Sequence, residues 1–502
     1  GHWGRSFLSH FTFVYGARHH TREMKYMLNM RKTKIVCTIG PSSQDEETFK
    51  ELVINGLNVA RLNFSHGTHE EHKEKINTIK KVREELNTSI AIMLDTKGPE
   101  IRIRDFIDGQ VELKKGQEFI LTTRELQGND SIVSVTYDQF ANDIKKGDTI
   151  LIDDGLISME AVEIINNTDI KCLVKNGGII KDKKGINVPD VQINLPALTD
   201  KDVSDIKFGI EQEIDYIAAS FIRKADDVIQ IRNILEKENA AHIMIISKIE
   251  NRQGVENIDE IIEASDGIMV ARGDLGVEIP AEEVPLVQKM IIKKCNQAGK
   301  PVITATQMLD SMIRNPRPTR AEVSDVATAI FEGTDAIMLS GETASGCYPL
   351  EAVKTMARIS LMIESSLNYG ELLERKRLGS TYSITDSISY AACKSCLDLN
   401  ASAIISATSS GYTAANVSRY RPVAPIIAAT QSDRVMRKLA LYWGVYTIKI
   451  GKMQSTDLII EKSVETALKL GYLKKGDIAI ITAGIPVGVS GITNLLKVHI
   501  VN

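Results

Sequence analysis

The sequence IMIISKIEN, residues 243–251, begins as an apolar run and ends with two charged side chains of opposite sign. An apolar run of this length is typical of a strand in the middle of a parallel sheet, where both faces are covered. Side chains alternate along a strand, so Lys248 and Glu250 point to the same face. Charged side chains are rarely buried unless they are paired or bind a ligand. The stretch is therefore either a structural ion pair at a strand end or part of a functional site.

Seven other short apolar runs resemble buried parallel strands, and most of them precede a helix-like segment. The eight runs are KIVCTIG (34–40), VARLNFS (59–65), IAIMLDT (90–96), YIAASFI (216–222), IMIISKI (243–249), GIMVARG (267–273), PVITATQ (301–307) and AIMLSGE (336–342). Eight β/α units predict an α/β fold, a closed (β/α)8 TIM barrel whose catalytic groups lie at the carboxyl ends of the strands.

Two further regions have a different pattern from the eight units. Residues 100–187 interrupt the regular spacing and read as short strands broken by Gly, Asn and Asp. We expect an inserted all-β domain there, a small β-barrel that can serve as a lid, with the catalytic barrel over 30–99 and 188–367. Beyond the polar stretch that starts at residue 368, strand-like runs alternate with helical segments, which predicts an open α/β regulatory domain over 368–502.

The overall composition is that of a soluble globular protein, with 502 residues, 43% of them hydrophobic and 25% charged. A net charge of −4 provides no general attraction to nucleic acid or to anionic membranes. We therefore expect neither as a partner, and an anionic substrate would need a local basic site. Apolar runs are too short for a membrane-spanning helix, which takes about 18 residues.

Six cysteines in so long a chain do not form a disulfide scaffold, so a reducing, cytoplasmic location is expected. Cys393 and Cys396 form one C-x-x-C pair, which we interpret as two free thiols on one helix face, because no second pair accompanies it. Residues 1–29 contain several Arg and His but no acidic residue before Glu23. They resemble a transit peptide only weakly, and a leader, a native extension and an added segment remain open.

Polar side chains follow six of the eight strand-like runs. They are Arg61, Asn63 and Ser65 in the second, Asp95 and Thr96 in the third, Lys248 and Glu250 in the fifth, Asp274 in the sixth, Thr306 in the seventh, and Ser340 and Glu342 in the eighth. Because the strand ends of a barrel meet at one mouth, we expect these side chains to share one cavity. Glu250 and Asp274 suit a hard divalent cation such as Mg²⁺, while Lys248 and Arg61 suit a phosphoryl group. The alternative is a set of structural ion pairs.

Two short motifs, one at the end of the sixth strand-like run and one after the seventh, indicate local structure. ARGDLG, residues 271–276, predicts a glycine turn before a helix at AEEVPLVQKMIIKK, where backbone N–H groups can receive a carboxylate or phosphate. TRAE, Thr319 to Glu322, fits a helix capping box, to which no chemistry is assigned.

Eight motifs resemble those of the pyruvate kinase family, in the same order along the chain. They are TKIVCTIGPSS (33–43), NVARLNFSHG (58–67), LDTKGPEIR (94–102), IISKIEN (245–251), MVARGDLG (269–276), ATQMLDSM (305–312), PRPTRAE (316–322) and LSGETA (339–344). The resemblance runs from about Arg31 to the chain end. It implies a glycolytic phosphotransferase that moves the phosphoryl group of phosphoenolpyruvate to ADP, giving pyruvate and ATP, with Mg²⁺ (or Mn²⁺) and K⁺ as cofactors.

The resemblance also implies a role for each matching residue. Lys248 would steady the migrating phosphoryl group, and Arg61 would contact the substrate phosphate. Glu250 and Asp274 would hold Mg²⁺. The Gly273–Asp274 backbone would receive the substrate carboxylate, and Thr306 lies where the enolate gains its proton. Asn63, Ser65, Asp95 and Thr96 resemble the K⁺ site. Asn63, His66, Arg102 and Lys184 match nucleotide-contacting positions. Glu100 resembles the K⁺-dependent branch of the family.

An allosteric phosphate site is expected in the third domain at SATSSGYTAAN, residues 406–416. Hydroxyls and N–H groups of a loop before a helix can converge on a phosphate there, although a plain Ser/Thr-rich turn fits the residues equally well. The resemblance favours an effector loop made of Thr408, Ser409, Ser410, Gly411 and Thr413. The companion loop 484–494 contains no Lys, Arg or Trp. We therefore expect a monophosphate, such as AMP or ribose 5-phosphate, rather than fructose 1,6-bisphosphate.

Two other functions remain as alternatives. A lysine at a barrel strand end also fits a Schiff-base aldolase, although neighbouring carboxylates would keep Lys248 charged rather than nucleophilic. A catalytically inactive sugar-phosphate sensor is the second alternative, and the complete set of strand-end residues argues against it. The family resemblance further implies a homotetramer.

Overall fold

The structure is a computed structural model that describes residues 30–453, 455–486 and 489–502. Residues 1–29, for which a leader, a native extension and an added segment were left open, lie outside the described residues. The chain divides into two compact units, one of which contains Arg61–Asn77 and Ala91–Gln307. The other contains Thr78–Ile90 and Met308–Asn502, together with the chain up to Ala60.

Eight short parallel strands form a closed barrel, as predicted, in the order β1-β17-β16-β15-β14-β13-β3-β2. They are β1 (Lys34–Thr38), β2 (Val59–Asn63), β3 (Ala91–Asp95), β13 (Tyr216–Ala219), β14 (Met244–Ile249), β15 (Gly267–Ala271), β16 (Val302–Ala305) and β17 (Ala336–Leu339). Each of the eight predicted runs contains one of these strands. Every residue of β14 is buried, as expected for a strand covered on both faces.

Helices follow the barrel strands. The longer ones are α3 (Glu46–Asn55), α4 (His69–Glu85), α6 (Asp200–Glu211), α7 (Ala225–Lys237), α11 (Val284–Ala298), α12 (Arg320–Glu332) and α14 (Pro349–Ser366), and the shorter ones are α8 (Arg252–Glu256), α9 (Ile258–Ala264), α10 (Arg272–Glu278) and α13 (Gly341–Ala344). The capping box predicted at TRAE is confirmed: Thr319 caps α12 through the N–H of Glu322, whose side chain bonds back to the Thr319 N–H.

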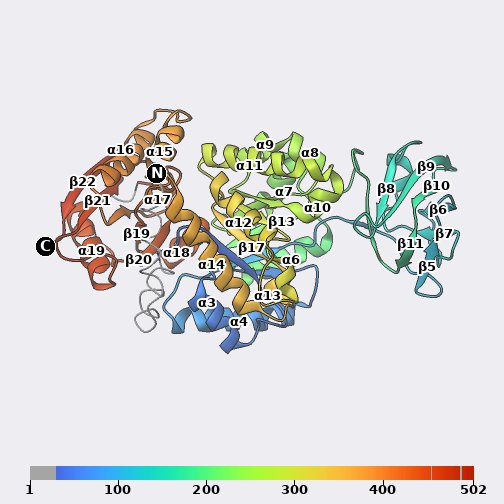
Figure 1. The fold of residues 1–502 in the computed structure, drawn as a ribbon, viewed down its shortest axis with the longest axis horizontal. Helices are drawn as coiled ribbons and strands as arrows, with labels where there is room; N and C mark the ends of the chain where they lie inside the picture. The colour runs from blue at the N-terminus through green and yellow to red at the C-terminus, as the bar shows by residue number, and fades with distance from the viewer. Residues whose placement is uncertain (1–29, 454, 487–488) are drawn as a thin grey trace, which may run out of the picture. The chain divides into compact units, whose positions relative to one another are not determined.

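The inserted region consists mainly of strands, as predicted, with one short helix, α5 (Phe140–Asp143), and its strands lie together in the ribbon (teal in Figure 1). A seven-stranded sheet contains β4 (Ile101–Arg102), β12 (Gly185–Asn187), β8 (Thr149–Ile152), β9 (Ile157–Ile165), β10 (Asp169–Asn176), β6 (Glu118–Thr122) and β7 (Ile132–Ser134), and a two-stranded sheet pairs β5 (Gln110–Leu113) with β11 (Gly178–Lys181). Its own core includes Phe119, Phe140 and Ile150. The predicted closure into a small barrel stays a prediction.

The last region is an open α/β sheet, as predicted, with strand order β20-β19-β18-β21-β22. Its strands are β18 (Ala403–Ala407), β19 (Ile426–Thr430), β20 (Val445–Lys449), β21 (Ile478–Ala483) and β22 (Leu495–Ile500); its helices are α15 (Tyr369–Arg377), α16 (Ile384–Asp398), α17 (Tyr412–Ser418), α18 (Asp433–Lys438) and α19 (Thr456–Lys469). The pairing of β22 with β21 is antiparallel, whereas the other pairs in this sheet are parallel.

All six cysteines are free, as predicted for Cys393 and Cys396, and only Cys347 is exposed. Burial raises the pKa of Cys172 to about 12 and that of Cys396 to about 11. Within the described ranges, no helix is long and apolar enough to cross a membrane.

Candidate active site

Two cations from different strands converge on Asp95, at the end of β3. The Arg61 Nε lies 2.6 Å from Asp95 Oδ2, and the Lys248 Nζ lies 2.9 Å from Asp95 Oδ1. The Asp95 side chain is 1% exposed, and those of Arg61 and Lys248 are about one-tenth exposed. Burial would raise the pKa of Asp95, but Arg61 and Lys248 hold it below its usual range. The barrel mouth therefore holds a carboxylate with two cations fixed on it.

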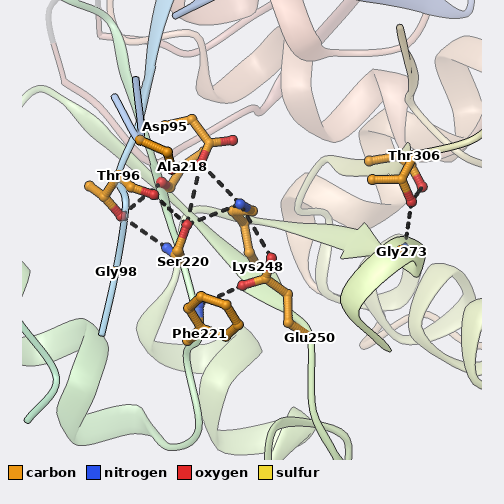
Figure 2. A network of polar contacts seen from close by, with 12 residues as sticks. Asp95, Thr96, Gly98, Ala218, Ser220, Phe221, Lys248, Glu250, Gly273 and Thr306 are labelled. Atoms are coloured by element: carbon orange, nitrogen blue, oxygen red, sulfur yellow. Dashed lines mark hydrogen bonds and ion pairs between the residues drawn. The ribbon is translucent and has the colours of Figure 1, made fainter. Parts of the chain in front are cut away.

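Lys248 also contacts the carboxylate that follows it on the same strand face (Figure 2). Its Nζ lies 3.3 Å from Glu250 Oε1, and Glu250 Oε2 accepts a hydrogen bond from the Phe221 N–H at 2.6 Å. Burial alone would lower the pKa of Lys248, but Asp95 and Glu250 outweigh it and raise that pKa above its usual value. Lys248 is thus a buried, charged ammonium held between carboxylates of two strands.

Asp274 supplies a second, partly buried carboxyl beside Glu250. Burial raises the pKa of Glu250 to about 7, an effect that Lys248 opposes and that Asp274 reinforces. The pKa of Asp274 is raised as well, also by burial. Two neighbouring carboxyls with raised pKa values are poorly solvated as anions, and a hard cation between them would relieve that cost. Among the described residues, no group of three His, Cys, Asp or Glu side chains could hold a metal. A cation here would therefore also need oxygens from substrate or water.

The structure corrects the prediction of a glycine turn at ARGDLG. Residues Arg272–Glu278 already form a helix, α10, which starts directly after β15, so Asp274 lies in its first turn. Neither Gly273 nor Gly276 has a positive φ. The prediction failed because the two glycines were interpreted as turn residues. The change from strand to helix takes place at Ala271, whose backbone has φ of −91° and ψ of 84°.

Thr306 adopts a backbone conformation that a β-branched residue rarely takes, with φ of +69°. Its Oγ1 donates to the Ala305 carbonyl at 2.7 Å and accepts from the Gly273 N–H, also at 2.7 Å. The Arg272 Nη2 donates to the Thr306 carbonyl at 2.7 Å. Strain of this kind persists where surrounding contacts impose it and is concentrated at functional sites. Thr306, which was predicted from its place at a strand end, thus has a strained backbone and is hydrogen-bonded to α10.

Ser220 belongs to this network but was missed by the sequence analysis. Its Oγ donates to the Thr96 carbonyl at 2.5 Å and accepts from the Lys248 Nζ at 3.0 Å, and its N–H donates to Thr96 Oγ1 at 3.0 Å (Figure 2). Ser220 directly follows β13, so the rule that polar residues follow strands could have found it. The apolar residues Phe221 and Ile222 continue the run and conceal the strand end.

The predicted monovalent-cation residues come from two neighbouring strand ends. The Asn63 Oδ1 accepts a hydrogen bond from the Ser65 N–H at 3.1 Å, and the Phe64 N–H donates to the Asp95 carbonyl at 2.9 Å. The residue after Asp95, Thr96, offers both a carbonyl and a hydroxyl oxygen. Such oxygen donors suit a hard cation.

A cavity of about 760 Å³ brings residues of the insertion together with residues of the barrel. Arg102, Lys184, Asp274 and Glu278 line it. The Arg102 guanidinium contacts both oxygens of the Glu100 carboxylate, at 2.7 and 2.9 Å, and the Lys184 Nζ lies 2.9 Å from Asp153 Oδ1. The two cations predicted to contact a nucleotide therefore share one cavity with Asp274, each paired with a carboxylate.

At the end of the eighth strand, the Glu342 side chain bonds to nearby backbone N–H groups. Glu342 is buried and accepts hydrogen bonds from the N–H groups of Ser340 and Leu309, at 2.6 and 3.3 Å. These bonds hold the chain where β17 enters α13.

Comparison with known proteins identifies the family. The family profile described as "Pyruvate kinase, barrel domain" matches residues 30–353, and the one described as "Pyruvate kinase, alpha/beta domain" matches residues 386–499. The chain belongs to the pyruvate kinase family. A pyruvate kinase of Geobacillus stearothermophilus is 54% identical over 94% of this chain and 81% of its own length. One of Clostridium acetobutylicum is 55% identical over 94% of this chain and its full length.

A solved structure supports the same assignment to the pyruvate kinase family. The crystal structure of a pyruvate kinase from Cryptosporidium parvum has a TM-score of 0.91 and 40% sequence identity, and covers 95% of this chain and 97% of that one. The chain is therefore an enzyme of this family, with the family's barrel and α/β domains.

Four of the five predicted effector residues, Thr408, Ser409, Ser410 and Thr413, line a second cavity, of about 620 Å³. Gly411, with φ of +90°, precedes α17, and its N–H donates to Thr408 Oγ1 at 2.9 Å. The Ser410 Oγ accepts from the Ser490 Oγ of the companion loop at 2.8 Å, and Thr413 bonds to Thr493 at 2.9 Å.

Two further features of this second cavity affect what it could bind. Ser409 lines it and is exposed. Lys452, which the sequence analysis missed because it lies outside both loops, also lines it.

Proposed function

We propose that this enzyme transfers the phosphoryl group of phosphoenolpyruvate to ADP, giving pyruvate and ATP. One observation carries the proposal: the buried ammonium of Lys248, held by Asp95 at 2.9 Å and Glu250 at 3.3 Å, next to a third carboxyl from Asp274. Phosphoryl transfer is accelerated mainly by positioning and by charges fixed where negative charge develops. This constellation supplies such charges at one barrel mouth.

Lys248 and Arg61 bind and orient the phosphoryl group in this proposal. Both reach Asp95, so their head groups are preorganised and need not reorganise during the reaction. Ser220 Oγ also accepts a hydrogen bond from the Lys248 Nζ, at 3.0 Å.

Glu250 and Asp274 would hold Mg²⁺ or Mn²⁺, because hard cations take carboxylate oxygens and leave other positions to water and substrate. When bound, such an ion polarises phosphoryl oxygens and offsets their negative charge. Asn63, Ser65, Asp95 and Thr96 would hold K⁺ through oxygen donors. The residues of this chain fit both ions: Glu250 is buried and Asp274 partly buried, both carboxyls have raised pKa values, and the second group is rich in oxygen atoms.

Loss of the phosphoryl group leaves the enolate of pyruvate, whose terminal carbon must gain a proton. We assign this position to Thr306, through water, since its hydroxyl is held by the Ala305 carbonyl and the Gly273 N–H. The backbone at Gly273 and Asp274 would receive the substrate carboxylate. The N–H of Gly273 is bonded to Thr306 in this structure, so binding would exchange that bond.

The nucleotide would occupy the 760 Å³ cavity, where Arg102 and Lys184 contact its phosphates, and Asn63 and His66 would contact it from the loop after β2. A diphosphate competes with Glu100 and Asp153 for these two cations. Arg and Lys are the side chains that recognise phosphate.

A Schiff-base aldolase fits the site poorly. That chemistry needs a neutral amine, whereas two carboxylates raise the pKa of Lys248. The test is a coupled assay of pyruvate formation that depends on ADP, with Mg²⁺, Mn²⁺ and K⁺ added in turn. Borohydride trapping of a keto acid on Lys248, without ADP-dependent pyruvate formation, would overturn the proposal.

The third domain is proposed to carry the allosteric site, with the residues around the 620 Å³ cavity as its ligands and a monophosphate as its effector. Among the described residues that line the cavity, Lys452 is the one cation, and together with the neutral hydroxyls of Thr408 and Ser410 it suits one phosphate better than two. We further propose the catalytic barrel over 30–99 and 188–367, the lid over 100–187, the regulatory domain over 368–502, a homotetramer, and a cytoplasmic location.

A further inference from the structure

The loop that follows β2, Asn63–His66, is fixed by a set of backbone hydrogen bonds. The N–H of Phe64 donates to the Asp95 carbonyl at 2.9 Å, and the N–H of Ser65 donates to Asn63 Oδ1 at 3.1 Å. The carbonyls of Phe64 and His66 accept bonds from side chains of two different helices. The loop is thus attached to α4 and α6, and neither attachment is part of the chemistry proposed above.

His72, on α4, forms the first attachment. Its Nε2 lies 2.7 Å from the His66 carbonyl, and a carbonyl only accepts, so Nε2 carries the proton. Burial lowers the pKa of His72, which keeps the ring neutral. The ring stacks on Phe64 at 3.9 Å between centroids with an angle of 11°. Gly67, with φ of +82°, permits this approach, because a Cβ there would lie 3.2 Å from His72 Nε2.

Lys201, on α6, forms the second attachment. Its Nζ donates to the Phe64 carbonyl at 2.8 Å and to Asp205 Oδ2 at 2.5 Å. The other oxygen of the buried Asp205 lies 2.7 Å from His69 Nε2, and the His69 ring stacks on Phe208 at 4.3 Å. The Lys201 ammonium is therefore itself oriented by a buried carboxylate, so its bond to the loop has a defined direction.

We propose that His72 and Lys201 are positioning residues that set the Asn63–His66 loop for nucleotide and K⁺ binding. The inference rests on the proposed function, in which Asn63, Ser65 and His66 contact those ligands. Because both side chains bond to carbonyls of the loop, they orient the Phe64–Ser65 and His66–Gly67 peptide units. Their effect falls on ADP and K⁺, and not on phosphoenolpyruvate, because Lys248 and Arg61 are held separately by Asp95.

The experiment compares variants that separate the hydrogen bond from packing. H72F keeps a ring on Phe64 and removes the donor, whereas H72Q keeps a donor and removes the ring. K201M removes the cation at similar length, and K201R keeps it. K207M, on the exposed face of the same helix, is the matched control. For each variant of the full-length enzyme, we would measure the KM for ADP, the half-saturating K⁺ concentration, the KM for phosphoenolpyruvate, kcat and the melting temperature.

We expect H72F and K201M to raise the KM for ADP and the half-saturating K⁺ concentration about five- to tenfold, the range set by losing one hydrogen bond. Their kcat at saturation and KM for phosphoenolpyruvate should stay within about twofold of wild type, and H72Q, K201R and K207M should resemble wild type. Unchanged ADP and K⁺ constants in H72F and K201M would overturn the inference. Equal changes in all constants with a lower melting temperature would overturn it too, since they indicate a purely structural role.

S65A and H66A, measured alongside, separate this inference from the proposed function. If they raise the ADP and K⁺ constants while H72F and K201M do not, the positioning role fails and the assigned contacts stand. If H72F and K201M raise these constants while S65A and H66A do not, positioning by the loop stands and the contacts assigned to Ser65 and His66 fail.

Discussion

The barrel mouth and the cavity of the third region are both proposed anion sites, but the first is built from buried charged side chains and the second mainly from uncharged ones. At the mouth, Lys248 is a buried cation held by two carboxylates at the ends of β3 and β14. The cavity around Thr408 and Ser410 is lined mainly by uncharged residues, with Lys452 as a cation at its edge, and the Thr408 and Ser410 hydroxyls bond to the Gly411 N–H and to Ser490. Rearranging buried charges costs much free energy, whereas a hydroxyl group can rotate to suit different hydrogen-bond partners. The first design favours a single reaction geometry, and the second favours adjustable ligand recognition.

The two designs also predict different costs of losing one group. Removing a buried cation leaves its carboxylates unpaired in a low-dielectric site, which is expensive. Removing one loop hydroxyl loses a bond that water can replace, because Ser409 is exposed and Ser410 is partly exposed.

The largest effect is expected for K248M. We expect kcat to fall on the order of 10²-fold or more, because the ammonium opposes charge that develops on the phosphoryl group in flight. The fold should persist, since the apolar core around β14 is untouched. Stopped-time pyruvate assays and a circular dichroism melt would measure both. A kcat within a few fold of wild type would contradict the assignment.

The next effect concerns E250Q and D274N, which each remove one carboxylate. We expect the half-saturating Mg²⁺ concentration to rise about tenfold or more, since a direct ligand charge is lost. Titration of Mn²⁺ followed by electron paramagnetic resonance would report binding without activity. E278Q is the matched control, because Glu278 is a carboxylate in the same helix that contacts Asn187 and is not assigned to the metal. Equal behaviour of all three variants would break the proposed division of roles.

A smaller effect is expected from Glu100, which holds Arg102 by two contacts. Activity of the wild type should collapse when K⁺ is replaced by a bulky organic cation, and E100K should relax that demand because it brings its own positive charge. E100K should also change the KM for ADP, since it releases Arg102 into the cavity. Full activity of the unmodified enzyme without K⁺ would refute this prediction.

The smallest effect on catalysis is expected for the double variant T408A/S410A. Its kcat without effector should match that of the wild type, while the effect of AMP or ribose 5-phosphate on the saturation curve for phosphoenolpyruvate should disappear. Coupling between the two ligands must be reciprocal, so phosphoenolpyruvate should also tighten effector binding in the wild type. Activation by fructose 1,6-bisphosphate alone would show that the ligand is wrong, and a wild-type response would show that the site is wrong.

The sequence was most informative about buried parallel strands, because their signal is local. Each of the eight apolar runs contains a barrel strand, and polar residues at strand ends led to Asp95, Lys248, Glu250 and Thr306. Several strands were not predicted, among them β9 and β22. The strand β9 contains the charged residues Glu160 and Glu163 among its apolar residues. The strand β22 is an antiparallel edge strand in which Val498 and Ile500 are exposed. Neither resembles a continuous apolar run.

The pairing of side chains could not be read from the sequence. Lys248 and Glu250 do contact each other, yet the nearer partner of Lys248 is Asp95, which precedes it by 153 residues. That contact depends on barrel closure. The same holds for Lys201 and His72, whose bonds to one loop follow from helix placement, and for Lys452, which joins the second cavity from outside both predicted loops.

The placement of the cysteines makes selective chemistry available to an experimenter. Five of the six thiols are buried, and only Cys347 is exposed. Thiolates, rather than thiols, react with alkylating reagents and oxidants, and burial raises the pKa of Cys172, Cys393 and Cys396. The native enzyme should therefore take one maleimide label, at Cys347, without any engineered substitution. A fluorophore or spin label placed there would provide a single reporter position on the unmodified chain.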